Sequence, residues 1–446
     1  LHVLDTVHGD AVHHVRERLV PATWAVVASI APGDVVTSSL LARFRADLVE
    51  GLGAEPGLGP TRAASRIVVI DHGGGDGDGD GAGTGQDDGL GHGLGVAGDT
   101  DPDRGTALGD GGGAALEPAD LTVSEPVSLD GPFGALSTPG RLSAALLGLD
   151  GRAHLAGLAD VVATTRSPDL DVNEAARLGA FLAAAVNAHR DQLTVVPDAA
   201  TTGFVEWVEH LVAAATGKSG VGLVPIVDEP LLEPIAYGPS RFVVAIGIHH
   251  GIRSVAEAGI PVVTLDEFGV DGLAVEWFRW QFATAVACAL IGVDPFAVPE
   301  VMTWRRLTRK VLDGGGRRLA IQPMDDLLDE LEDADWLALL GFVDPNAMAA
   351  HQLRRVTATL RRRYGIPVRL EFAPACLSTT GQLHKAGPPE GVFAVVLEPA
   401  STRIPVPGAG EDLEDILEAS AAGDVAALRD AGRVVVVVDL DELLAA

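Results

Sequence analysis

Residues 192–227 read QLTVVPDAATTGFVEWVEHLVAAATGKSGVGLVPIV, and this stretch decides the fold class. Its two ends, 192–198 and 222–227, are short apolar runs rich in β-branched residues, which predict strands. Residues 203–215 between them carry apolar side chains at helical spacing. Apolar strands separated by a helix indicate a parallel sheet that is covered on both faces. The stretch therefore predicts an α/β fold.

The same alternation of strand and helix continues along the chain. Further strands are predicted at 1–6, 24–30, 66–71, 241–248, 261–266, 368–374, 391–399 and 433–440. Further helices are predicted at 36–50, 173–189, 275–292, 325–336 and 347–364. We therefore expect two doubly wound lobes with parallel sheets, with ligands bound outside the carboxyl ends of the strands.

The composition narrows the function classes. The chain has 446 residues and a formal net charge of -30, which argues against nucleic acid or an anionic membrane as a partner. No apolar run reaches the roughly 18 residues of a membrane helix. Cys288 and Cys376 lie in apolar stretches without motif spacing, and no signal peptide is recognisable. These features predict a cytoplasmic protein with reduced thiols.

One segment, 71–113, is rich in Gly and Asp and almost free of large apolar residues. The functional alternative is calcium binding, because the run that starts at Asp76 matches the opening of an EF-hand loop. The twelfth position of that loop is Asp87 rather than Glu, and a predicted strand precedes it instead of a helix. Such a composition buries too little apolar surface to fold. We therefore expect an irregular, disordered acidic insertion at about 72–118 without bound calcium.

Three stretches resemble one protein family when taken in order. They are HLVAAATGKSGVGLVPIVDEPL, EWFRWQFATAVACALIGVDPFAVPEV and STTGQLHKAGPPEGVF, at 210–231, 276–301 and 378–393. They resemble the glucose-6-phosphate isomerase module of bacterial transaldolase–isomerase fusion proteins. The resemblance implies two sugar-isomerase-type (SIS-type) lobes, at 1–150 and 151–320, and a C-terminal α/β extension at 321–446. It also implies a sugar-phosphate ligand, a homodimer or a partner among sugar-phosphate enzymes, and a first lobe that lacks its N-terminal strand and Gly-rich turn.

The phosphate group of such a ligand is expected after the strand at 24–30. There the family has a hydroxyl-rich turn that leads into a helix N-terminus, where free N–H groups bind phosphate. In this chain the turn retains Ser29, contains Pro32, which has no N–H, and ends in Asp34. A carboxylate at Asp34 is a good N-cap for the following helix, and it repels a phosphate dianion. The residues therefore predict a self-capped helix rather than a phosphate site.

The three catalytic positions that the resemblance identifies are all substituted. Ala214 stands where the family has the general base, Pro132 replaces the Arg that stabilises the enediolate, and Arg305 replaces the ring-opening Lys. Alanine accepts no proton, and the pKa of a guanidinium is too high for proton exchange. Gly217 is expected to end its helix in the left-handed conformation, with Lys218 near the negative helix end.

The stretch 378–385 keeps several polar side chains of the family pattern. Ser378 replaces a His, whereas Gln382, His384 and Lys385 persist. These side chains either bind an anion or a sugar hydroxyl, or they hold the loop to a neighbouring lobe. Glu276 is a further remnant catalytic candidate beside His384 and Lys385, although its aromatic helix favours a core position. The substrate-binding candidates are Ser29, Thr216, Lys218, Gln382, His384 and Lys385.

No metal or cofactor is expected. His249 and His250 are adjacent and project differently, and no Cys or carboxylate stands at ligand spacing from them. No P-loop, GxSxG or strand-following GxGxxG motif occurs. We therefore expect a glucose-6-phosphate isomerase homologue that has lost its chemistry and acts as a non-catalytic subunit or partner. The alternatives are an active cytoplasmic isomerase of glycolysis and gluconeogenesis, and a sugar-phosphate-binding regulator.

Overall fold

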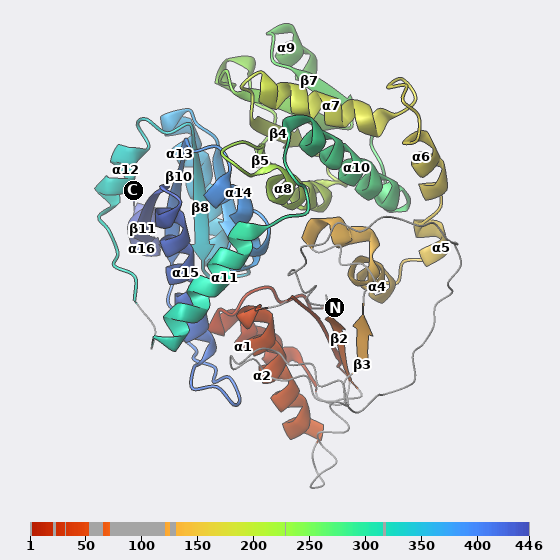
Figure 1. The fold of residues 1–446 in the computed structure, drawn as a ribbon. Coiled ribbons are helices and arrows are strands. Elements are labelled where there is room, and N and C mark those ends of the chain that lie inside the picture. The colour runs from red at the N-terminus through yellow and green to blue at the C-terminus, as the bar shows by residue number, and fades with distance from the viewer. Residues whose placement is uncertain are drawn as a thin grey trace, which may run out of the picture.

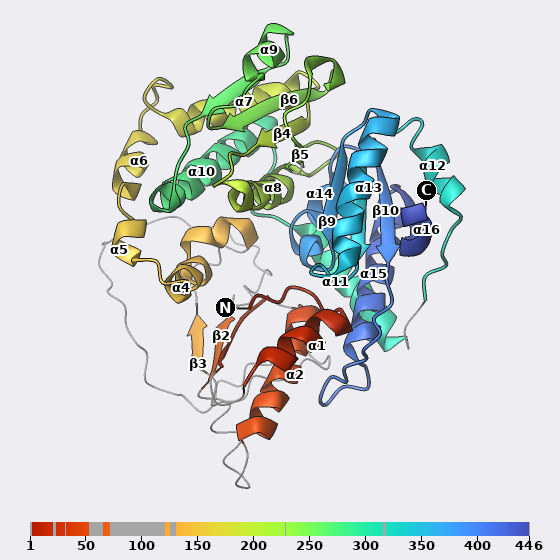
Figure 2. The same cartoon turned by 180° about the vertical axis from the view of Figure 1, so that it is seen from behind.

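The computed structural model describes residues 2–20, 24–31, 33–52, 66–71, 121–124, 131–227, 229–314 and 318–445. Three parallel sheets with helices packed beside them make up the fold (Figures 1 and 2). The chain is thus an α/β protein, as predicted. The expected acidic insertion at 72–118, and with it the calcium alternative, lies outside the described residues. Within the described ranges, no helix is both long enough and apolar enough to cross a membrane.

The stretch 192–227 forms a strand, a helix and a second strand in the middle sheet. These elements are β4 (Gln192–Val196), α8 (Thr202–Thr216) and β5 (Val224–Ile226). The sheet continues with β6 (Arg241–Ile246) and β7 (Val262–Leu265), in the order β5-β4-β6-β7, and all pairs are parallel. Every residue of β4 and β6 is buried, because helices cover both faces. One face packs against α8, α7 (Glu174–Asn187) and α10 (Leu273–Ile291), and the other against α9 (Ile252–Glu257).

A second four-stranded sheet lies in the C-terminal part of the chain. It has the order β11-β10-β8-β9 and is parallel throughout, with β8 (Trp336–Phe342), β9 (Val368–Phe372), β10 (Gly391–Leu397) and β11 (Val434–Asp439). One face packs against α11 (Pro299–Asp313) and α15 (Leu413–Asp430). The other face packs against α12 (Met324–Glu330), α13 (Met348–Tyr364) and α16 (Leu440–Ala445). Helix α11 lies before residue 320 in the sequence and packs along α15, which lies after it. The predicted domain boundary at 320 stays a prediction.

A three-stranded parallel sheet belongs to the N-terminal part of the chain. It has the order β1-β2-β3, with β1 (Val26–Ile30), β2 (Ile67–Asp71) and β3 (Leu121–Ser124), and α2 (Val35–Leu52) packs on β1 (Figure 2). The connection to the middle sheet is helical. It comprises η1 (Gly131–Leu136), α4 (Thr138–Leu146), α5 (Gly151–His154) and α6 (Leu158–Thr164). Short 3-10 turns η2 (Pro234–Ala236) and η3 (Val270–Gly272) follow later.

The first described residues pack both on the C-terminal sheet and on α2. Helix α1 (Gly9–Arg18) begins against the loop that follows β10. Ser401 donates two hydrogen bonds to Asp10, from N (2.9 Å) and from Oγ (2.8 Å). A side chain at Gly9 would place its Cβ 1.8 Å from the carbonyl oxygen of Thr402, so only glycine fits. The start of α1 is therefore built onto the carboxyl end of the C-terminal sheet.

Two buried ionic contacts join the middle sheet to the C-terminal sheet. Glu209 of α8 binds Arg369 of β9, with 2.9 Å between Oε1 and an Nη. Glu229, whose side chain has no exposed surface, pairs with Arg241 of β6 and with Arg361 of α13, the latter at 2.8 Å. Because breaking a buried pair is costly, these contacts hold the two sheets in one arrangement.

Two sequence predictions of secondary structure are wrong. Residues 2–8 form no strand, because they run along the C-terminal sheet and the apolar cavity beside β1 without pairing. The acidic stretch 325–336 is not one helix, since α12 ends at Glu330 and Trp336 already begins β8. The other predicted strands and helices are confirmed, with ends shifted by a few residues.

Candidate functional site

The stretch 378–385 lies in the connection between β9 and β10 of the C-terminal sheet, and most of it is buried. It follows the turn η4 (Ala375–Ser378) and forms the short helix α14 (Gly381–Ala386), which packs against α8 and α11. Gln382 and His384 have no exposed surface, and Lys385 is 4% exposed. Three of the predicted substrate-binding side chains therefore lie inside the protein.

His384 is held by a buried ionic cluster on β9. Its Nε2 lies 3.1 Å from Oε1 of Glu371, and the same oxygen accepts from Arg369 at 2.7 Å. Thr380 donates to the second oxygen of Glu371. Burial raises the pKa of Glu371, but Arg369 and His384 outweigh it and hold that pKa well below its usual range. Burial also lowers the pKa of His384, so we infer a neutral imidazole that donates from Nε2 to an ionised Glu371.

The other two polar groups of this stretch are engaged by neighbouring elements. Lys385 pairs with Asp424 of α15, and neither side chain is exposed. Gln382 donates from Nε2 to the carbonyl of Gly217 (3.1 Å), and its Oε1 accepts from the N–H of Glu300 (3.0 Å). These contacts favour the structural alternative for the stretch over anion binding.

Thr216 and Lys218 close the C-terminal end of α8. Thr216 Oγ1 donates to the carbonyl of Val212 (2.7 Å) and accepts from the N–H of Leu223 (2.9 Å). Lys218 Nζ donates to the carbonyl of Ala214 (2.8 Å) and to the next carbonyl along the helix. Its position near the negative helix end is thus confirmed, and burial lowers the pKa of its ammonium to about 8.

The prediction that Gly217 takes the left-handed conformation is wrong. Its φ is -72°, whereas Gly220 and Gly222, further along the turn, have positive φ. The physical reason for glycine at 217 is close packing. A Cβ there would lie 2.5 Å from the Cα of Leu383 in α14.

One cavity of about 660 Å³ brings together Lys218, Gln382 and Lys385. Its third cation, Arg433, donates to the carbonyls of Lys385 (3.0 Å), Gly387 (2.6 Å) and Pro388 (3.0 Å). Each basic side chain on this wall is therefore already bound to protein oxygen atoms. Ser29, Thr216 and His384 lie outside this cavity.

The expected phosphate end of the site is built around Asp34. Its Oδ1 accepts from the N–H of Thr37 (3.0 Å) and its Oδ2 from the Thr37 hydroxyl (2.7 Å), so the predicted self-capping of α2 is confirmed. Ser29 and Asp34 line a cavity of about 710 Å³ whose walls are mainly apolar, with Trp24 and Phe44 among them. A carboxylate in an apolar wall disfavours a phosphate dianion.

The three substituted catalytic positions come from α8, η1 and α11, and none of them lines the cavity of 660 Å³ or that of 710 Å³. Ala214 is buried within α8, and its carbonyl holds Lys218. The carbonyl of Pro132 accepts from the Trp207 indole at 3.1 Å. Arg305 is half-buried on α11.

Glu276 is also part of the core, as its helix predicted. It is 6% exposed and pairs with Arg279 at 2.8 Å. Burial raises the pKa of Glu276 despite this partner. In the described part of the chain, no group of three or more His, Cys, Asp or Glu side chains could hold a metal ion.

Sequence reasoning missed Arg369, Glu371, Asp424 and His210. The signal for the first two was present, because Arg and Glu two residues apart in an otherwise apolar strand share one face of the sheet. His210 stands one helical turn before Ala214, and its Nδ1 contacts the hydroxyl of Thr379. Burial lowers the pKa of this imidazole.

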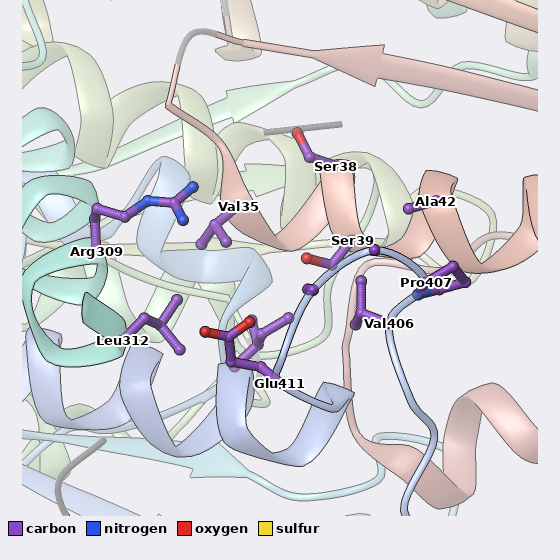
Figure 3. Close-up of a pocket in the computed structure, with 12 residues that line it drawn as sticks. Val35, Ser38, Ser39, Ala42, Arg309, Leu312, Val406, Pro407 and Glu411 are labelled. Carbon is purple, nitrogen blue, oxygen red and sulfur yellow. The ribbon is translucent and has the colours of Figure 1, made fainter. Parts of the chain in front are cut away.

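A smaller cavity of about 260 Å³ lies away from these residues, between α2, α11 and the loop before α15. Figure 3 shows Arg309 and Glu411 entering it from different elements, with Ser39 on the α2 side. It contains none of the predicted site residues.

No family model and no curated protein matches this chain. Solved structures do match. A hypothetical protein from Thermus thermophilus gives a TM-score of 0.50 at 21% identity, over 70% of this chain and 77% of that chain. A glucose-6-phosphate isomerase from Chlamydia trachomatis gives 0.45 at 13% identity, over 69% and 63%. The C-terminal domain of a glucosamine-fructose-6-phosphate aminotransferase from Francisella tularensis gives 0.21 at 9% identity, over 63% and 94%. The chain therefore shares the α/β fold of the Thermus protein over most of its length.

Proposed function

We propose that this chain is a glucose-6-phosphate isomerase homologue that has lost isomerase chemistry and serves as a non-catalytic subunit or partner of sugar-phosphate enzymes. The observation that carries the proposal is the N-cap at Asp34. Its carboxylate occupies both the N–H and the hydroxyl of Thr37 at the helix end where the family resemblance puts the phosphate. A phosphate there would meet a negative charge instead of free N–H groups.

The catalytic positions support the same proposal. Aldose–ketose isomerisation needs a base near C1 and C2 and a cation for the enediolate. Ala214 offers no proton acceptor, and Pro132 offers its carbonyl to Trp207 rather than a cation to a substrate. Losing a positioned base costs about 10²–10⁴ in rate.

The test is a coupled assay for conversion of fructose 6-phosphate to glucose 6-phosphate, with chain purified from a host that lacks its own isomerase. We expect no detectable turnover, from the wild-type chain or from the Ala214→Glu variant. A restored base would still lack a phosphate anchor and a cation, and residues that act as a unit are strongly non-additive. Robust turnover by the wild-type chain would overturn the proposal.

A sugar-phosphate-binding regulator is the second candidate, because Lys218, Gln382 and Lys385 line one cavity. Glucose 6-phosphate should then raise the melting temperature, by an amount that follows its concentration over Kd. The non-catalytic partner role predicts no such rise. Light scattering on the purified chain would check the expected homodimer.

A further inference from the structure

A cavity of about 490 Å³ lies between α8, β9 and α13, and none of the substituted catalytic positions lines it. Its walls carry Glu206, Glu209 and His210 from α8, Glu371 from β9, and Arg354 and Thr357 from α13. The positions of Ser29, Pro132, Ala214 and Arg305 do not line it. A cavity of this size with a few convergent polar groups is typical of a small-molecule site.

The contact of His210 with Thr379 assigns a tautomer to its imidazole. Thr379 Oγ1 contacts His210 Nδ1 and also donates to the carbonyl of Cys376 at 3.2 Å. A hydroxyl has one proton and a carbonyl can only accept, so with the Thr379 proton directed to Cys376 we assign the proton of the His210 contact to Nδ1. Nε2 then keeps its lone pair, and among the described residues it has no hydrogen-bond partner. Burial lowers the pKa of the ring, which favours this neutral form.

The wall behind His210 is rigid. Arg369 bridges Glu209 (2.9 Å) and Glu371 (2.7 Å), and it lies over the ring of Trp336 at 5.9 Å from the centroid. These side chains are buried, and they come from helix α8 and from strands β8 and β9 of the C-terminal sheet. A ligand would therefore meet hydrogen-bonding groups that are already in place, which reduces the entropic cost of binding.

The charges around the cavity select the ligand. The carboxylates of Asp5, Glu206, Glu209 and Glu371 line it, against the single guanidinium of Arg354. With Arg369 behind the wall included, carboxylates still outnumber guanidiniums by two. Anions are repelled, and a ligand that brings hydrogen-bond donors is favoured, because carboxylates and Nε2 can only accept.

We propose that this cavity binds a small, hydroxyl-rich molecule without negative charge, and that His210 accepts a hydrogen bond from it through Nε2. The proposal does not depend on the non-catalytic role proposed above. The ligand can satisfy these acceptors with hydroxyl groups alone or with hydroxyl groups and a protonated amine. Glucose carries only hydroxyl groups and glucosamine carries both, so the two sugars distinguish an uncharged ligand from a cationic one.

The test is calorimetric titration of the whole chain with glucose, glucosamine and glucose 6-phosphate. At least one of the first two should bind with a Kd in the millimolar range or tighter, and the phosphate should bind at least roughly tenfold more weakly. Stronger binding of glucosamine would identify a cationic ligand, and equal binding an uncharged one. Failure of both sugars to bind, or equal binding of the phosphate, would overturn the proposal.

A matched pair of variants locates the binding. His210→Asn keeps a donor at the Nδ1 position for Thr379 but removes Nε2, and it should weaken binding roughly tenfold, as expected for one hydrogen bond. His250→Asn changes an exposed histidine elsewhere and should leave Kd unchanged. If His210→Asn fails to fold, Glu206→Lys is the second variant, because Glu206 is an exposed residue on the same wall. It should reduce the difference between the Kd of the sugars and the Kd of glucose 6-phosphate. Unchanged binding in the variant that folds would place the ligand elsewhere and refute the assignment.

Discussion

Lys385 of α14 and Asp424 of α15 form an ion pair whose two side chains are wholly shielded from solvent. Removing one partner leaves an uncompensated buried charge, which typically costs about 3–5 kcal/mol. We therefore expect Lys385→Met or Asp424→Leu to lower the free energy of unfolding by about that amount. The double variant Lys385→Met/Asp424→Leu should recover most of the loss. Urea denaturation of the three variants measures the coupling.

The control for this cycle is the exposed pair Arg253–Glu257, at 2.8 Å on the surface of α9. Arg253→Met should change stability by at most about 0.5 kcal/mol, because exposed i,i+4 pairs contribute little. If Lys385→Met lowered the free energy of unfolding as little as Arg253→Met, the charge that remains on Asp424 would be compensated by another group.

Asp34 should contribute to stability through its cap on α2. Asp34→Ala is expected to cost about 1 kcal/mol, because the N–H of Thr37 loses its acceptor. Asp34→Ser should retain most of the stability, since serine also caps helices. Denaturant midpoints of the two variants are the measurement, and equal midpoints would mean that the cap is not stabilising.

Gly217 and Gly203 should respond oppositely to alanine. Gly217→Ala places a Cβ 2.5 Å from the backbone of Leu383, and overpacking of this kind costs about 1–3 kcal/mol. Gly203 stands in the first turn of α8 with nothing within 4 Å of a Cβ, so Gly203→Ala should stabilise by up to about 1 kcal/mol. Thermal melts of both variants separate packing from helix propensity, and a stabilising Gly217→Ala would contradict the close contact between α8 and α14.

Acid should destabilise the protein through His384. Its pKa is lowered in the folded state, so below about pH 6.5 the unfolded chain binds a proton that the folded chain does not. Stability then falls as pH decreases, by up to about 1.4 kcal/mol per pH unit until the folded pKa is reached. His210 acts in the same direction. Asp191, whose pKa is raised to about 6, acts in the opposite direction below that pH.

Urea denaturation between pH 7.5 and 6.0 of the wild-type chain and of His384→Gln isolates the histidine effect, because Asp191 titrates in both proteins. His384→Gln should show a shallower decrease than the wild-type chain over this interval. Parallel curves for both proteins would assign the acid sensitivity to other groups.

Much of the fold is predictable because the signals are local. β4 and β6 are rich in β-branched residues. Asp34 stands just before the apolar residues at helical spacing in 36–50, where an N-cap residue is expected. β8 escaped prediction because WLALLGF contains no β-branched residue, and only its position at the centre of a sheet makes it a strand. Propensity is overridden there by tertiary packing.

The candidate site was less predictable because its ion pairs join residues from different elements of the chain. His384 is recognisable as a polar residue, but its partner Glu371 and the bridge through Arg369 to Glu209 depend on how two sheets meet. The polarity of the stretch 378–385 therefore predicted a special environment without distinguishing a ligand from a protein partner.

The contact between Asp10 and Ser401 spans 391 residues of sequence. During synthesis, the segment that forms α1 leaves the ribosome long before the loop after β10 exists. It must wait through the production of all three sheets, and until then its apolar residues lack their partners in the C-terminal sheet. Contacts of such separation close late, so we expect docking of α1 to be among the last folding events and to depend on a complete C-terminal sheet. Prematurely terminated chains would then leave this segment accessible to proteases and chaperones.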